Sequence, residues 1–150
     1  MIKYYVISPE VPGGIGEKSI LEYNEGIVSR IVHLNFEFDD WLGDDVITTH
    51  PCLLVSLPLL AAINENNLIG YKVRNVELSC SELFVELNNC NTVPIFKLLE
   101  IENVDTIEDL VNLQMDFYFY QNRDFVVSES FLNLIKLFNI NNCEIKELKI

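Results

Sequence analysis

The chain has 150 residues, of which 49% are hydrophobic and 22% charged, with 10 Lys and Arg against 23 Asp and Glu. Apolar content at this level excludes an intrinsically disordered chain, and the length predicts a single domain. The formal net charge of −13 repels phosphate backbones and anionic lipid heads. The composition therefore argues against nucleic-acid and membrane partners and favours a basic protein, which long-range attraction would steer into contact.

The sequence shows no targeting or membrane-spanning segment. No run reaches the roughly 18 apolar residues of a transmembrane helix, and residues 1–7 lack the layout of a signal peptide. We therefore expect a cytoplasmic protein. The four cysteines, Cys52, Cys80, Cys90 and Cys143, include no CxxC pair, so we interpret them as reduced, mostly buried thiols rather than metal or redox groups.

The N-terminal third predicts strands separated by a glycine-rich segment. Apolar and aromatic runs over residues 3–7 and 28–38 are typical of strands. Residues 11–19 between them invite comparison with a phosphate-binding loop, but Glu17 stands directly before Lys18, where that loop needs glycine. A glycine-rich surface loop is the expectation for this segment.

The densest group of carboxylates follows the second of these strands. We call residues 37–45 the acidic turn; its candidate partner-binding residues are Glu37, Asp39, Asp40, Trp41, Asp44 and Asp45. One interpretation is a solvated acidic turn, and a separate alternative is that Asp44 serves only to cap a turn. Another is a recognition surface, because Trp41 is the only tryptophan and an aromatic ring among carboxylates suits a basic partner.

A metal site or an active centre is the competing interpretation of the acidic turn. Calcium loops need alternating oxygen ligands and a distant bidentate glutamate, whereas Asp44 and Asp45 are adjacent. The spacing thus predicts no tight divalent-metal site, and no cofactor is expected. Of the two histidines, His33 is expected as a buried or half-buried sheet residue, and no Ser or Cys, His and acid arrangement has a signature spacing.

An internal repeat is the most informative feature of the chain. Shifting the sequence by 72 positions places residues 53–78 over 125–150 without a gap, with Ser56 over Ser128 and matching apolar positions. Each copy predicts a strand, a short amphipathic helix and a second strand, and the two serines are candidate helix N-caps. The exit strands are expected over residues 71–78 and 143–150.

The remaining segments predict short elements. We expect a short helix from Ser81, a strand over residues 95–101 after Pro94, and a helical turn capped by Thr106. Residues 115–120 predict a strand, followed by a hairpin loop at 121–124.

Several short blocks carry a resemblance to known proteins. They are Val-Pro-Gly-Gly-Ile-Gly at 11–16, Leu-Asn-Phe-Glu-Phe-Asp-Asp-Trp-Leu-Gly-Asp-Asp at 34–45, His-Pro-Cys-Leu-Leu-Val at 50–55, Ser-Glu-Leu-Phe at 81–84 and Val-Val-Ser-Glu at 126–129. Together they resemble a family of small bacterial proteins of unassigned activity. The last block also resembles immunity proteins of bacterial polymorphic-toxin systems, which implies a cytoplasmic α+β protein that binds and neutralises a toxin domain. No catalytic residues come with either resemblance.

The sequence as a whole predicts one α+β domain with a mixed or largely antiparallel sheet and two similar strand-helix-strand units. The preferred function is a non-enzymatic immunity protein that blocks a basic toxin. A small enzyme or metal-binding protein using the acidic turn, and a structural partner in a larger assembly, remain the alternatives.

Overall fold

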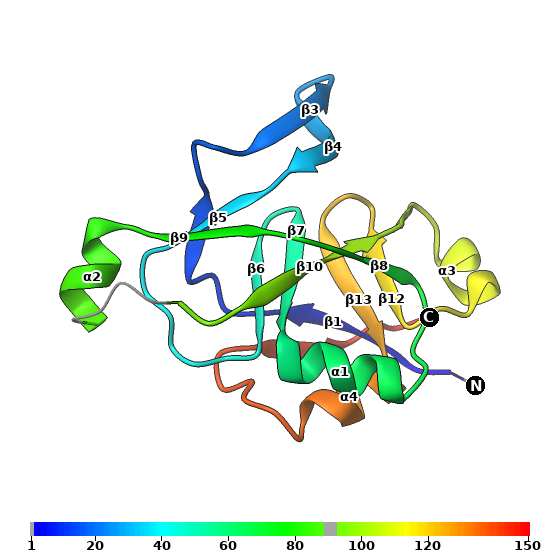
Figure 1. The fold of residues 1–150 in the computed structure, drawn as a ribbon. Helices are drawn as coiled ribbons and strands as arrows, with labels where there is room; N and C mark the ends of the chain where they lie inside the picture. Colours follow the sequence, from blue (N-terminus) through cyan, green and yellow to red (C-terminus); the bar gives the residue numbers. More distant parts are fainter. Residues whose placement is uncertain (1, 89–92) are drawn as a thin grey trace.

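Two sheets form the framework of the molecule (Figure 1). The four strands of the first have the same arrangement as the last four of the second, which has one additional strand at its edge. The computed structural model describes residues 2–88 and 93–150, so Cys90 lies outside the described residues. The first sheet has the order β6 (Val46–Thr49), β7 (Cys52–Ser56), β10 (Phe96–Ile101) and β8 (Tyr71–Arg74). The second has the order β11 (Asn103–Val104), β12 (Phe117–Tyr120), β13 (Asp124–Ser128), β1 (Tyr4–Ser8) and β14 (Glu144–Glu147).

The predicted repeat is confirmed as two strand-helix-strand units. Helix α1 (Leu57–Glu65) joins β7 to β8, and α4 (Glu129–Ile135) leads from β13 toward β14. Both predicted N-caps are also confirmed, since Ser56 Oγ accepts from the Leu59 amide and Ser128 Oγ accepts from the Phe131 amide. The two helices pack against each other on the same side of the molecule (Figure 1).

One further strand pairs with each unit of the repeat. These two strands, β10 and β1, are not related to each other by the sequence shift of 72. Strand β10 pairs with both strands of the first unit, placing Phe96 opposite Ser56. Strand β1 pairs in the same way with the second unit, placing Tyr4 opposite Ser128. Strand β1 thus occupies in the second unit the position that β10 occupies in the first. The two halves are therefore related by an approximate two-fold axis.

The chain passes between the two halves at equivalent points. After β1, the Glu10 carbonyl accepts from the Thr48 amide at 2.9 Å, at the edge of the first sheet. After β10, the Glu102 carbonyl accepts from the Phe119 amide at 3.0 Å, at the edge of the second sheet. The segment after β1 is therefore hydrogen-bonded to β6 of the first sheet, and the segment after β10 is hydrogen-bonded to β12 of the second. These contacts connect the two halves.

The central core lies between the two units, and both contribute matched side chains to it. Equivalent pairs in this core, all buried, include Leu53 and Phe125, Val55 and Val127, Leu59 and Phe131, Ile63 and Ile135, and Leu99 and Ile7. Burial of apolar surface on this scale is the main stabilisation of the fold.

The outer faces of the two sheets are covered by different elements. The first sheet is covered by β2 (Gly13–Ile15), β5 (Asn35–Phe38), β9 (Glu77–Cys80) and α2 (Glu82–Asn88), which supply Phe36, Phe38 and Phe84 to a second core. The second sheet is covered by α3 (Ile107–Leu113), through Leu110. The predicted α+β class with mixed sheets is confirmed, because β5 with β9 and β11 with β12 are parallel pairs among antiparallel ones.

A hairpin extends away from this body (Figure 1). It consists of β3 (Ile20–Asn24) and β4 (Ile27–His33), which form a two-stranded sheet of their own. We call residues 20–33 the arm. The prediction of one strand over 28–38 is therefore wrong: the chain pairs with β3 as far as His33 and then changes partners to β2 and β9.

Two further expectations need correction. The glycine-rich segment is not only a surface loop, because Gly13–Ile15 pairs with β5 as strand β2. The exit strand expected over 71–78 divides, since β8 ends at Arg74 and Leu78 belongs to β9 in another sheet. Only Gly fits at Gly13, where a Cβ would lie 1.9 Å from the Glu37 carbonyl oxygen.

The smaller predicted elements are confirmed. Helix α2 begins after Ser81, α3 is capped by Thr106, β10 follows Pro94, and β12 turns into β13 through Gln121 and Asn122, both with positive φ. None of the helices in the described ranges is long and apolar enough to cross a membrane.

Candidate functional site

The acidic turn is a folded loop organised around two buried carboxylates. Glu10, only 6% exposed, accepts hydrogen bonds from the amides of Leu42 at 2.7 Å and Asp44 at 3.4 Å. Burial raises the pKa of Glu10, and the two amide hydrogen bonds partly oppose that rise. This role of Glu10 could not be predicted from the sequence, because Glu10 lies more than thirty positions before its partners.

Asp44 is the second buried carboxylate and is fully enclosed. Its oxygens accept from the backbone amides of Asn141 at 3.0 Å and Asn142 at 2.8 Å, and from Asn142 Nδ2 at 3.2 Å. These contacts join the acidic turn to the loop before β14. Asp44 therefore acts as a cap, which is one of the alternatives that the sequence left open.

Asp45 is likewise engaged inside the protein. Its Oδ1 accepts from Ser56 Oγ at 2.7 Å and its Oδ2 from the Asn139 amide at 2.9 Å. Asp45 thus links the start of α1 to the segment that follows α4.

Trp41 is half-buried at the edge of the second core. Its ring meets Phe96 edge-on, with centroids 6.1 Å apart, and its Nε1 donates to the Asp44 carbonyl oxygen at 3.0 Å. The indole therefore fixes the loop and leaves only part of its surface available to a partner.

Exposed carboxylates and apolar side chains remain on the outer surface of the turn. Asp39 and Asp40 are exposed, while their amides both donate to the Pro12 carbonyl oxygen. Leu42 beside them is 62% exposed, and Glu37 is half-buried on β5. Helix α2 lies at the same end of the molecule (Figure 1), attached to β5 by the Ser81 amide, which donates to the Phe38 carbonyl oxygen. The structure thus separates the acidic turn into internal caps, Asp44 and Asp45, and an outer surface of Glu37, Asp39, Asp40 and Leu42 beside Trp41.

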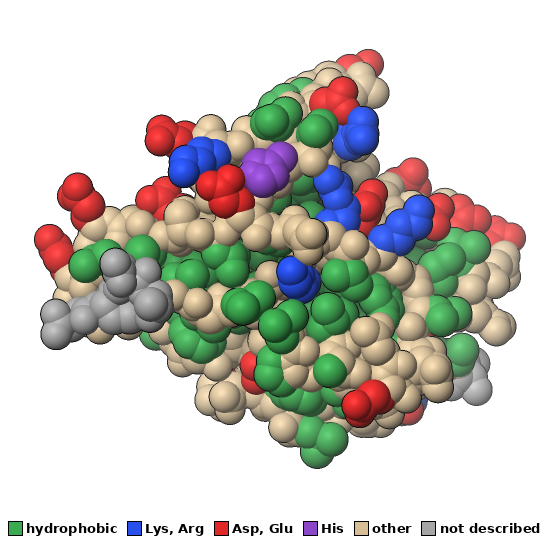
Figure 2. Space-filling model, in the orientation of Figure 1, with side chains coloured by type: hydrophobic (Ala, Val, Ile, Leu, Met, Phe, Trp, Pro, Cys, Tyr) green, Lys and Arg blue, Asp and Glu red, His purple; other side chains and the backbone are tan. Residues whose placement is uncertain are grey.

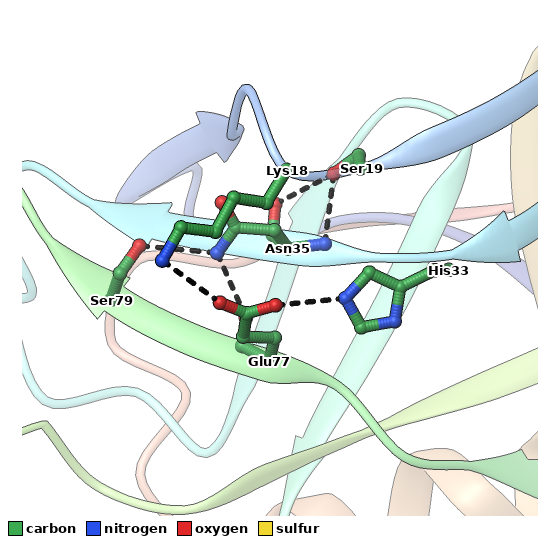
Figure 3. A network of polar contacts seen from close by, with 6 residues as sticks. All are labelled: Lys18, Ser19, His33, Asn35, Glu77 and Ser79. Atoms are coloured by element: carbon green, nitrogen blue, oxygen red, sulfur yellow. Dashed lines mark hydrogen bonds and ion pairs between the residues drawn. The ribbon is translucent and has the colours of Figure 1, made fainter.

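A second polar cluster lies at the base of the arm (Figure 3). Glu77 is 2.9 Å from His33 Nε2 and 3.4 Å from Lys18 Nζ. The hydrogen bond from His33 is the largest influence that lowers the pKa of Glu77. As predicted, His33 is a half-buried sheet residue.

The rest of this cluster joins the arm to β9. Ser19 Oγ donates to the Asn35 carbonyl oxygen and accepts from the Asn35 amide, and Asn35 Nδ2 donates to Ser79 Oγ at 3.1 Å. The serine hydroxyl is thus engaged on both sides, and the cluster connects the base of the arm to β9.

A cavity of about 240 Å³ separates the arm from the outer face of β10. Its charged lining residues already have partners: Arg30 lies 3.3 Å from Glu22, and Arg74 donates to the carbonyl oxygens of Ile31 and Val32. The cavity therefore marks the gap beneath the arm, and Arg74 bridges it.

Two of the cysteine thiols lie in surroundings that disfavour the thiolate. Burial raises the pKa of Cys52 to about 12 and that of Cys143 to about 11, so neither is an effective thiolate at neutral pH. Across residues 2–88 and 93–150, no group of three or more His, Cys, Asp and Glu side chains could hold a metal ion.

Comparison with known proteins gives no assignment: no family model, curated protein or solved structure matches the chain. The resemblance of the short sequence blocks to small bacterial proteins and to immunity proteins therefore stays a prediction.

Proposed function

We propose that the protein is a non-enzymatic binding protein that neutralises a basic protein, most concretely a toxin domain, by covering its working surface. The observation that carries the proposal is the outer surface of the acidic turn, where exposed Asp39 and Asp40 lie beside exposed Leu42. Carboxylates around an apolar contact suit a basic partner, since charge directs the encounter and apolar burial holds the complex.

The neighbouring helix extends this surface with apolar side chains. Leu83 and Leu87, one helical turn apart on α2, are 50% and 58% exposed. Helix α2 contributes Phe84 to the core, so its other side is left to solvent. An apolar area bordered by acidic residues is a feature of protein-binding surfaces.

The charge of the whole chain supports the same function. A net charge of −13 would raise the rate at which a basic protein arrives and would disfavour nucleic acids and anionic membranes. The proposal places the protein in the cytoplasm, where an immunity protein meets its toxin, and involves no cofactor.

The alternative of an enzyme or metal-binding protein would use Asp39, Asp40, Asp44 and Asp45 together. Asp44 and Asp45 already accept hydrogen bonds through both of their carboxylate oxygens. Using them as ligands would require breaking the contacts that hold the loop. The geometry therefore favours binding through the outer surface.

The test begins with the gene beside that of this protein. If a secreted protein with a toxin domain is encoded there, co-expression of the present chain should restore growth of cells producing that domain. The variant Asp39→Asn/Asp40→Asn should slow association by about tenfold at low salt, because exposed charges act mainly on the association rate.

A matched control removes two carboxylates from α3, at the opposite end of the molecule (Figure 1). Glu108→Gln/Asp109→Asn makes the same change in net charge. Equal slowing by both pairs would mean that only the overall charge matters. Failure of the unaltered chain to bind the neighbouring toxin domain would remove the proposed function.

A further inference from the structure

The arm is a hairpin held away from the body. Its strands β3 and β4 pair only with each other among the described residues, and they join at a turn in which Glu25 and Gly26 both have positive φ. A two-stranded hairpin is at best marginally stable in water on its own. Something other than its own pairing must therefore keep the arm in place.

Polar contacts at its base supply that support. Arg74 of β8 donates to the Ile31 and Val32 carbonyl oxygens, the second at 2.8 Å. The contact of His33 with Glu77 adds a connection to β9 (Figure 3). These polar contacts, together with Ile31, which packs against the second core, fix the arm in one position. Such an arrangement prepares a projecting element for binding.

The arm exposes apolar side chains along both of its strands, from its base to its turn. Tyr23 is 63% exposed, and Ile20 and Ile27 are each 56% exposed. Glu22 and Glu25 lie on the same hairpin and are both exposed, and Glu22 lies 3.3 Å from Arg30 of the facing strand. The space-filling view shows apolar, acidic and basic side chains together on this projection (Figure 2).

The charge of the molecule restricts what can cover this surface. A second copy of the chain would bring another net charge of −13 against the first, and nucleic acids and anionic membranes are repelled for the same reason. A basic protein is attracted, and a narrow projection reaches into a concave surface better than onto a flat one.

We infer that the arm is an insertion element that enters a basic cleft of the partner protein, with Tyr23 and Ile27 as apolar contacts and Glu22 and Glu25 facing its cationic residues. This inference rests on the proposed function, because the partner is the same basic protein. It adds a second contact, distinct from the outer surface of the acidic turn.

The test uses a photo-crosslinking residue, benzoylphenylalanine, in the full-length protein within cells that produce the partner. It is placed at Tyr23 on the arm, at Leu42 on the acidic turn, or at Leu137, a control position that is 81% exposed. We expect discrete adducts from positions 23 and 42, and none from 137. Mapping by mass spectrometry should place the adduct from position 23 on a concave surface of a protein with net positive charge.

The partner so identified is then purified and its affinity measured. Tyr23→Ala should raise the Kd by about tenfold or more, and Glu22→Gln/Glu25→Gln should slow association, whereas Leu137→Ala should leave both unchanged. Circular dichroism of each variant shows whether the fold is retained.

The possible outcomes separate the two proposals. An adduct at 42 without one at 23 overturns the insertion role and leaves the proposed function standing. An adduct at 23 alone supports the arm and counts against the acidic turn as the contact surface. Crosslinking to a second copy or to an acidic protein overturns the inference, and no adduct at either position overturns both proposals.

Discussion

Asp45 and Asp116 play the same part in the two halves of the molecule. Each carboxylate accepts from the N-cap serine of its own half, Ser56 at 2.7 Å and Ser128 at 2.6 Å. Each also accepts from a backbone amide beyond the helix of the other half, Asn139 at 2.9 Å and Ile69 at 2.8 Å. The two symmetry-related halves are thus held together by a reciprocal pair of carboxylates.

This reciprocity predicts similar losses for Asp45→Ala and Asp116→Ala. Each change leaves a serine hydroxyl and an amide without their carboxylate, which should lower the free energy of unfolding by about 1–3 kcal/mol. Urea denaturation of both variants measures the loss. A large effect of one variant and none of the other would show that the two contacts are not equivalent.

The place of β1 in the second unit predicts that the chain tolerates circular permutation. The Leu148 amide donates to the Tyr4 carbonyl oxygen at 2.9 Å, so the end of β14 lies beside the start of β1. A linker of about six Gly and Ser residues should join the termini, with new ends opened between Glu25 and Gly26 at the arm turn. We expect a cooperative thermal transition close to that of the original chain. A permutant opened between Leu54 and Val55, within a buried strand, is the control that should not fold.

Two adjacent glycines provide a test of the sheet that covers the first unit. Gly13→Ala would place a Cβ 1.9 Å from the Glu37 carbonyl oxygen, whereas a Cβ at Gly14 meets nothing within 4 Å. Gly13→Ala should lower the free energy of unfolding by about 1–3 kcal/mol through overpacking, and Gly14→Ala should change it little. Equal melting temperatures for the two variants would contradict the close pairing of β2 with β5.

Trp41 is predicted to matter for the fold as well as for binding. Trp41→Ala removes the ring contact with Phe96 and the hydrogen bond to the Asp44 carbonyl oxygen, which should cost about 2–4 kcal/mol of stability. Trp41→Phe keeps an aromatic ring and should recover part of that loss. Thermal melts decide the matter, and an unchanged melting temperature in Trp41→Ala would point to a role in binding alone.

The contact at the base of the arm should weaken in acid. Because the pKa of Glu77 is lowered in the folded protein, its contribution is present above the ordinary value of 4.5 and is lost as the pH falls through the lower folded value. The protection factors of the arm amides in hydrogen exchange, which correct for the pH dependence of the intrinsic exchange rate, should therefore fall in that acidic range. Glu77→Gln should already exchange faster at neutral pH and respond less to acid. Identical pH profiles for the two proteins would refute this anchoring role.

The units of the fold were predictable where the signal was local. Ser56 and Ser128 stand at the same points of an ungapped repeat, so the helix starts and the strands that precede them could be predicted directly. The equivalence of β1 with β10 could not, because it arises from pairing between distant segments and follows a different spacing along the chain.

The candidate site shows the same limit at the scale of single side chains. The sequence identified a cluster of carboxylates, but it could not tell that Asp44 caps a loop nearly a hundred residues away while Asp39 and Asp40 stay exposed. Composition gives the charge of a turn, whereas the distribution of that charge between interior and surface depends on contacts with remote backbone amides. The break at Leu34 was hidden for a related reason, since its two flanking strands have equally apolar patterns but different partners.

The unequal covers of the two sheets suggest a history of duplication followed by specialisation. The arm, the acidic turn and α2 all belong to segments attached to the first unit, while α3 is the one helix over the corresponding face of the second unit among the described residues. One half could therefore be conserved as scaffold while the additions to the other half adapted to a changing target. Related chains, when compared, should differ most in length and sequence across residues 11–45 and 75–95 and least in the paired strands beneath them.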